Sequence, residues 1–245
     1  MKKVTIVFFA FFFLSLKTTT FYCQNNELTK ESSYKWFDKV IGVGNTGLYN
    51  GIQYERKFNP LHNDHEYYLS SEFLIGDIIY NGQPYYDILL KYDIYNDDLI
   101  VKLPSYTSFN IIKLIKQHVK SFSINNNNKF VNIKASNSSV ENVVGFYEVI
   151  FDDGNIKMYK KHQKSLKKHL EKSYVYDAFK NKEEYFLFYN NTYYKIKSKR
   201  NFFKILPNLK KNINSYYNSY YKLKREDYDV FLLNFSKYLS EILTS

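Results

Sequence analysis

Hydrophobic and polar positions alternate in short runs between about residues 40 and 196, and turn signals punctuate these runs. The clearest alternation spans residues 85–94, where the even positions are apolar and the odd positions include Asp87, Lys91 and Asp93. Successive side chains of a strand point to opposite faces, so this pattern predicts an antiparallel strand with one buried face.

Five turn signals separate the predicted strands. Asn81-Gly82 is the strongest, because both residues tolerate the left-handed backbone that a two-residue hairpin needs. Residues 111–119 are ambiguous, and a short helical turn between strands fits them. The other four signals are Asn96-Asp97-Asp98, residues 125–128, Asp153-Gly154 and Asn190-Asn191. The predicted strands span residues 76–80, 85–94, 99–103, 121–124, 129–133, 145–151, 155–160, 185–189 and 193–197.

After Lys197 the hydrophobic period changes from two to about 3.6, as in helices that bury one face. Ser198 suits the N-cap of a short helix ending near Leu206, and Pro207 suits the first turn of the next helix. Asp227 suits the cap of a final helix. The apolar faces of the last two helices comprise Leu209, Ile213, Tyr216, Tyr217 and Tyr220, and then Tyr228, Phe231, Leu232, Phe235, Tyr238, Leu239 and Ile242.

These patterns predict a mainly β fold, an antiparallel meander that is barrel- or sandwich-like, with a helical C-terminal segment, so α+β overall. Closing the sheet would protect its edges, and the final helices could cover any part left open. We expect a β-rich domain over residues 24–197 and a helical segment over residues 198–245 packed on it.

The first 23 residues are predicted to be a signal peptide. A basic start is followed by an apolar run over residues 4–16, which is shorter than the roughly 20 residues of a membrane-spanning helix. We place cleavage between Cys23 and Gln24, and acylation of Cys23 in a lipoprotein is the alternative. The protein is therefore expected to be exported, to the periplasm, the outer-membrane surface or the medium, with membrane association at most peripheral or through a lipid anchor.

Composition narrows the class of protein. Aromatic residues make up 20% of the 245 residues, which argues against disorder, and a mean hydropathy of −0.47 argues against a polytopic helical membrane protein. The chain has one cysteine, so no internal disulfide is possible.

Charge is distributed unevenly along the chain. Residues 24–110 carry 7 Lys and Arg against 12 Asp and Glu, whereas residues 111–245 carry 25 against 12. A basic half of an exported protein suits an anionic partner, such as a glycolipid or polysaccharide, or an envelope protein. Codon bias toward lysine and asparagine is the competing explanation. The candidate contacts are Lys160, Lys161, Lys164, Lys167, Lys168, Lys195, Lys197, Lys199 and Arg200.

Three motifs were weighed as enzyme or cofactor sites. Gly42-Val43-Gly44-Asn45-Thr46-Gly47 matches the dinucleotide-binding pattern, but a strand-like segment rather than a helix follows it at residues 48–58. In the loop His62-Asn63-Asp64-His65-Glu66, the His-x-x-His spacing could supply two zinc ligands, but the metalloprotease pattern His-Glu-x-x-His is absent and the surrounding Asn and Pro60 indicate a solvated turn. Asp77, Asp87 and Asp93 could provide the paired carboxylates of a hydrolase, but exposed charges on a strand face are the simpler explanation. We therefore expect no enzyme, no cofactor and no metal site.

Aromatic and basic residues interleave over residues 193–203, a pattern that superficially suits single-stranded nucleic acid. Export makes this partner improbable, and no nucleic acid is expected.

Several segments resemble a family of secreted and cell-envelope proteins of Bacteroidota that has no assigned activity. They are residues 68–73, 76–83, 92–95, 145–147 and 193–199. The resemblance implies a cell-envelope or secreted bacterial protein and implies no activity. The chain departs from the family pattern after His65, where a proline is expected.

The sequence thus favours an exported non-enzymatic protein that binds a protein partner or an anionic surface component. Two alternatives remain: a carrier of small apolar ligands with a calycin-like barrel, and an integral outer-membrane β-barrel.

Overall fold

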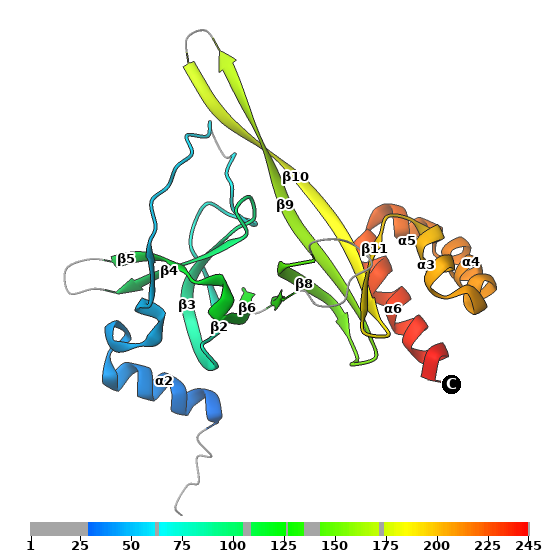
Figure 1. Cartoon of the computed structure of the whole chain (residues 1–245), viewed down its shortest axis with the longest axis horizontal. Coiled ribbons are helices and arrows are strands. Elements are labelled where there is room, and N and C mark those ends of the chain that lie inside the picture. Colours follow the sequence, from blue (N-terminus) through cyan, green and yellow to red (C-terminus); the bar gives the residue numbers. More distant parts are fainter. Residues whose placement is uncertain are drawn as a thin grey trace, which may run out of the picture. The chain divides into compact units, whose positions relative to one another are not determined.

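Eleven strands form one sheet in the computed structural model, and every pairing between them is antiparallel (Figure 1). The structure describes residues 29–61, 64–104, 109–125, 127–134, 143–171 and 174–244. The strands are β1 (Gly51–Gln53), β2 (Leu74–Tyr80), β3 (Gln83–Asp93), β4 (Asp98–Pro104), β5 (Phe109–Leu114), β6 (Val119–Ile124), β7 (Asn128–Ile133), β8 (Gly145–Asp152), β9 (Ile156–Glu171), β10 (Tyr174–Tyr189) and β11 (Thr192–Ile196).

The α-helices lie before and after the sheet in sequence, and the chain also forms four short 3-10 turns. The α-helices are α2 (Lys30–Ile41), α3 (Lys199–Ile205), α4 (Lys210–Ser219), α5 (Tyr221–Glu226) and α6 (Tyr228–Thr244). The 3-10 turns span Val43–Asn45, Gly47–Tyr49, Lys116–His118 and Pro207–Leu209. The mainly antiparallel β fold with a helical C-terminal segment is confirmed.

The sheet is open. Its strand order is β1-β5-β4-β3-β2-β6-β7-β8-β9-β10-β11, so β1 and β11 are its two edges and do not pair with each other in the described chain. The expectation of a closed barrel is therefore wrong. Edge strands of three and five residues limit the exposed backbone, which is one way a protein protects an open sheet.

The predicted hairpins are confirmed, because Asn and Gly residues take the left-handed backbone that their turns require. Asn81 and Gly82 have φ angles of 51° and 81°, and Asn190 and Asn191 have 49° and 56°. Positive φ at both central residues is the signature of the type I′ hairpin. The turn between β5 and β6 is a 3-10 turn at Lys116–His118, which resolves the ambiguous segment.

Strand β3 corrects the predicted alternation. Leu90 and Tyr92 are buried as expected, but Tyr85 is buried instead of Tyr86. The parity changes at Asp87, whose φ is 55°, and the pairing of β2 with β3 is irregular opposite it. A bulge inserts one residue and so exchanges the two faces of a strand.

The motif 42–47 forms two 3-10 turns and not the strand–helix junction of a nucleotide site. After it, the expected strand over residues 48–58 is confined to β1. Helix α2, which the hydrophobic pattern did not predict, precedes it.

A first hydrophobic core lies among strands β2 to β8. The rings of Tyr92, Phe122, Phe130 and Phe146 meet in it with centroids 4.8–5.7 Å apart. These four side chains are at most 2% exposed, so aromatic rings fill this interior.

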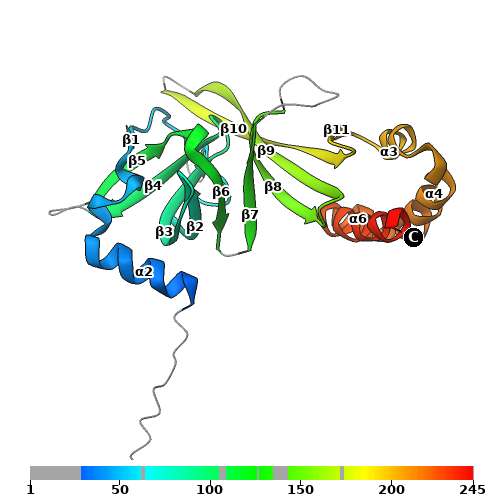
Figure 2. The same cartoon turned by 60° about the horizontal axis from the view of Figure 1, so that its bottom comes forward.

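A second core lies between strands β8–β11 and the C-terminal helices. Phe231, Phe235 and Leu239 of α6 are fully buried there, and α6 lies beside β8 in both views (Figures 1 and 2). The predicted caps are confirmed: Ser198 forms a capping box with Asn201, and Asp227 Oδ1 accepts from the backbone N–H of Val230 at 2.9 Å.

Residues 34–245 form one compact unit, so the helical segment shares a unit with the sheet. Within the described chain, no helix combines the length and the apolar character that crossing a membrane requires.

Candidate functional site

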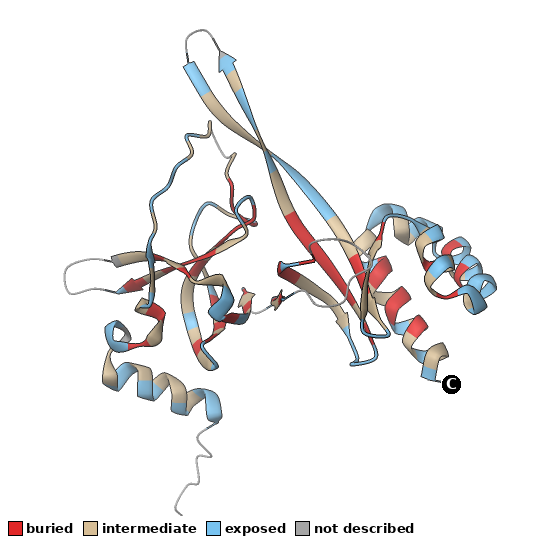
Figure 3. Ribbon diagram, in the orientation of Figure 1, coloured by how far each residue is buried: buried red, intermediate tan, exposed pale blue. Residues whose placement is uncertain are grey.

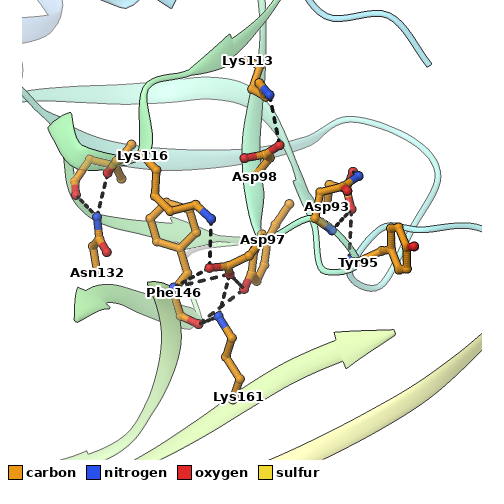
Figure 4. Close-up of polar contacts among 12 residues, drawn as sticks. Asp93, Tyr95, Asp97, Asp98, Lys113, Lys116, Asn132, Phe146 and Lys161 are labelled. Atoms are coloured by element: carbon orange, nitrogen blue, oxygen red, sulfur yellow. Dashed lines mark hydrogen bonds and ion pairs between the residues drawn. The ribbon is translucent and has the colours of Figure 1, made fainter. Parts of the chain in front are cut away.

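Lys161 lies in a buried polar network centred on the carboxylate of Asp97 (Figure 4). Its Nζ donates to Asp97 Oδ1 at 2.6 Å and to the carbonyl oxygen of Phe146 at 2.9 Å. The hydroxyl of Tyr92 and the Nζ of Lys116 also donate to Asp97. Burial lowers the pKa of Lys161, and the charge of Asp97 offsets part of this effect. Lys161 therefore stabilises the fold and faces no partner.

Gly145 makes room for this network. Its φ is 105°, and a Cβ atom built on it would lie 1.9 Å from Asp97 Oδ2. Only glycine fits both the backbone angle and the close approach.

Lys160 also forms its ion pairs within the protein. Its Nζ lies 2.7 Å from Asp229 Oδ2 of α6 and 2.9 Å from Glu183 Oε1 of β10, and its side chain is 7% exposed. Burial alone would lower the pKa of Lys160, but the hydrogen bonds to the two carboxylates outweigh it and raise the pKa. The pair ties α6 to the sheet.

His162 and Glu148 form the next polar pair on the same face of the sheet. His162 Nε2 lies 2.5 Å from Glu148 Oε2, and Asn128 donates to Glu148 Oε1 at 2.6 Å. Burial alone would raise the pKa of Glu148, yet the hydrogen bonds from His162 and Asn128 bring it below its ordinary value. The ring of Tyr68 packs edge-on against His162.

A cavity of about 530 Å³ lies between the loop around His65 and the middle of β9 and β10. Lys164 faces it and donates to the carbonyl oxygen of His65, while burial lowers the pKa of Lys164. The remaining candidates of this strand, Lys167 and Lys168, are exposed near the distal end of the β9–β10 hairpin. Strand β9 therefore separates its lysines between the interior and the surface and does not gather them at one site.

The remaining four candidates do come together, in a groove of about 770 Å³. Strand β11 ends there and α3 begins there, and α4, α5 and α6 contribute Tyr217, Lys224 and Tyr228 to its lining. We call it the basic groove. Its cations are Lys195, Lys197, Lys199, Arg200 and Lys224.

The cations of the basic groove differ in how far they are neutralised. Lys195 Nζ lies 2.6 Å from Glu184 Oε1, and Lys199 Nζ donates to Asn214 Oδ1 at 2.6 Å. Lys197, Arg200 and Lys224 form no ion pair with any described residue. Glu183 and Glu184 are the acidic residues that line the groove, so positive charge predominates there.

An aromatic side chain supports two of these cations. Lys199 and Lys224 lie over the ring of Tyr217, each with its Nζ under 6 Å from the ring centroid. Burial raises the pKa of Tyr217, so it stays neutral and its ring face attracts the cations. Tyr217 therefore holds an amine from α3 and another from α5 at one place.

Local structure explains why these residues meet. The side chain of Asn201 accepts from the backbone N–H groups of Lys197 and Ser198, which fixes the passage from β11 into α3. Lys197, Lys199 and Arg200 therefore lie on one short corner. The helix breaks at Tyr220, and α5 after this break places Lys224 in the groove. The periodicity did not predict this break.

The structure also shows residues that the sequence reasoning missed. Lys224 lies in a separate basic run, Lys222 to Arg225, so the sequence gave no reason to group it with the candidate contacts of residues 195–200. Glu148, His162 and Asp229 come from three separate elements. These elements are β8, β9 and α6, and no local sequence pattern links the three residues.

The acidic candidates make local contacts within the fold. Asp87 is exposed and lies 2.7 Å from Lys35 Nζ, and its backbone N–H donates to Asp77 Oδ1. Asp93, expected on an exposed strand face, is 1% exposed and caps the next turn by accepting from the backbone N–H groups of Tyr95 and Asn96.

The histidine loop is described only in part, since His62 and Asn63 lie outside the described residues. Glu66 is buried and pairs with Arg56, and Asp64 accepts from the backbone N–H of Phe179. His65 Nδ1 accepts from the backbone N–H of Tyr67. Among the described residues, no group of three His, Cys, Asp or Glu could hold a metal ion. Cys23 and the proposed leader also lie outside the described residues.

No protein-family model matches the chain, and neither a curated protein nor a solved structure is significantly similar to it.

Proposed function

We propose that the protein is an exported, non-enzymatic binding protein whose basic groove takes an anionic group of a saccharide-bearing surface component. One observation carries this proposal. Three segments bring five cations to one groove, and three of them have no carboxylate partner in the described chain.

Codon bias can account for the number of lysines, but it does not account for their convergence at one place in the folded chain. Most of the strand β9 lysines are either buried in internal pairs or spread along a hairpin, whereas those of the groove converge. Holding like charges together costs Coulomb energy, which an anionic ligand would remove. Export rests on the predicted leader and on the resemblance to secreted proteins of Bacteroidota.

The carrier and outer-membrane alternatives are less well supported, because both depend on a closed barrel and the sheet is open.

The test is binding by the chain that starts at Gln24. Dextran sulfate represents an anionic polysaccharide, lipopolysaccharide an anionic glycolipid, and neutral dextran is the uncharged control. We expect binding to one or both anionic probes that weakens as salt is raised, and no binding to dextran. Lys197→Gln with Arg200→Gln should weaken binding about tenfold, since each exposed ion pair contributes up to about 1 kcal/mol.

Lys210→Gln with Lys211→Gln is the matched control. It removes the same charge from exposed positions of α4 outside the groove and should leave affinity nearly unchanged. Equal losses in the two double variants would mean that net charge alone attracts the probe, and absence of salt-sensitive binding would also refute the proposal.

A further inference from the structure

The distal end of the β9–β10 hairpin exposes three apolar side chains. Leu170 and Val175 are direct cross-strand partners and are 74% and 54% exposed, and the neighbouring Tyr174 is 50% exposed. The buried residues of both strands lie toward the second core, and both strands are half-buried or exposed toward this end (Figure 3). We call these three residues the apolar tip.

The hairpin is a continuous ladder up to the apolar tip. Its pairing runs without a register shift from Ile156 opposite Tyr189 to Glu171 opposite Tyr174. Near the tip, Asn59 Nδ2 donates to the hydroxyl of Tyr174 at 2.8 Å. The ring of Phe58 packs edge-on against Phe179 with centroids 5.2 Å apart. The segment around Asn59 thus supports the hairpin, while the tip stays uncovered in the described structure.

The sequence on either side of the apolar tip carries an excess of positive charge. Residues 163–182 contain six lysines and two acidic residues. Lys167 and Lys168 are exposed and form no ion pair with a described residue. Long lysine stems can lie along an apolar surface while the ammonium groups reach an anionic layer.

We propose that the apolar tip inserts shallowly into the surface of an anionic phospholipid bilayer, with Lys167 and Lys168 at the headgroups. Tyrosine and aliphatic residues beside lysine are the composition of an interfacial anchor. A stable protein interface buries about 800 Å² on each partner, more than three side chains can supply. A small apolar tip with a basic surround therefore fits a bilayer better than a protein.

The test uses flotation with vesicles of phosphatidylcholine and phosphatidylglycerol at 3:1, compared with pure phosphatidylcholine. We expect the chain starting at Gln24 to float with the anionic vesicles and to stay behind with the neutral ones. Leu170→Ser with Val175→Ser keeps the net charge and should lower the partition coefficient at least about tenfold. Lys167→Gln with Lys168→Gln should lower it about 30-fold at low salt.

Two further variants distinguish this proposal from the basic groove and from misfolding. Lys197→Gln with Arg200→Gln should float as the unmodified chain does. Ile75→Ser, at another exposed apolar position (51%), is the matched control and should also float normally. In a Trp36→Phe, Leu170→Trp chain, the one remaining tryptophan should shift to the blue on anionic vesicles.

Flotation unaffected by the Leu170→Ser, Val175→Ser pair would overturn the proposal, as would an unshifted tryptophan emission. Failure of the unmodified chain to float with anionic vesicles would also overturn the proposal. So would tip substitutions that change only the self-association of the chain. The far-ultraviolet circular dichroism of each variant should match that of the unmodified chain, because the tip makes few packing contacts.

Discussion

At the residue scale, Asp97 shows how a half-buried charge decides local structure. It accepts from Tyr92, Lys161 and Lys116, so one carboxylate joins the first core to β9. Nothing in the turn signal Asn96-Asp97-Asp98 distinguishes Asp97 from its neighbour. Asp98 makes a more exposed pair, 3.3 Å from Lys113 Nζ.

Asp97→Ala should lower the free energy of unfolding by about 3–5 kcal/mol, because it leaves the buried ammonium of Lys161 without a carboxylate. Urea unfolding measures this, and Lys161→Met in the same chain should recover part of the loss.

Asp98→Ala is the adjacent control and should cost at most about 1 kcal/mol, since its pair with Lys113 is partly solvated. Equal losses of unfolding free energy at the two positions would show that the network around Asp97 stabilises the fold no more than a surface ion pair does.

At the scale of elements, α6 is the helix that closes the second core. Its stripe was readable from the sequence, and the structure buries Phe231, Leu232, Phe235 and Leu239 completely. Lys160 adds a polar tie by reaching Asp229 at the start of the helix.

Phe235→Ala should lower the free energy of unfolding by about 3–5 kcal/mol, the cost of a cavity left by a fully buried ring. Lys237→Ala, an exposed position on the same helix, should change it by at most about 0.5 kcal/mol in the same urea experiment. A small effect of Phe235→Ala would mean that the helix is not held against the sheet.

At the scale of the whole molecule, one open sheet carries three hydrophobic clusters: the two cores described above and a smaller one that includes Tyr147, Tyr159 and Phe186. Strand β8 contributes to both cores, and the polar pair of Glu148 and His162 lies on β8 and β9. The first core is closed by the sheet's own aromatic rings and the second by helices.

The Glu148 pair predicts a pH dependence. The pKa of the Glu148 carboxyl is lower in the folded chain than its ordinary value of 4.5. The ionised carboxylate therefore stabilises the fold above about pH 4.5, and this contribution is lost as pH falls through the folded pKa. Glu148→Gln should cost about 1.5–3 kcal/mol of unfolding free energy at pH 7, and the difference from the unmodified chain should shrink at pH 3.

Urea unfolding at the two pH values measures this difference. Glu226→Gln, an exposed carboxylate of α5, should be nearly neutral at both. A cost for Glu148→Gln that does not change with pH would contradict the role assigned to the Glu148 carboxylate.

The sequence predicted part of the candidate site. The candidate contacts chosen from the sequence included four of the five groove cations, because lysine content is visible in the sequence. Which of those lysines are free was not visible. Lys160 and Lys161 are adjacent to each other and indistinguishable by composition, yet opposite faces of β9 give them Asp229 and Asp97 as separate partners.

The sequence by itself determined the elements that depend on neighbouring residues. Asn-Gly and Asn-Asn pairs placed their turns, Ser198 and Asp227 began their helices, and period-two and period-3.6 patterns separated strand from helix. These signals act over a few residues, so no tertiary contact is needed to set them.

Only the tertiary structure decided the features that depend on long-range pairing. The bulge at Asp87, the 16-residue strands β9 and β10, the open sheet and the arrival of Lys224 in the groove each follow from contacts between distant segments. The middle of β9 and β10 is rich in charged residues and shows no apolar alternation, so its strand character comes from the partner strand. Burial and charge pairing are properties of the assembled chain, and for that reason they could not be read from any single stretch of it.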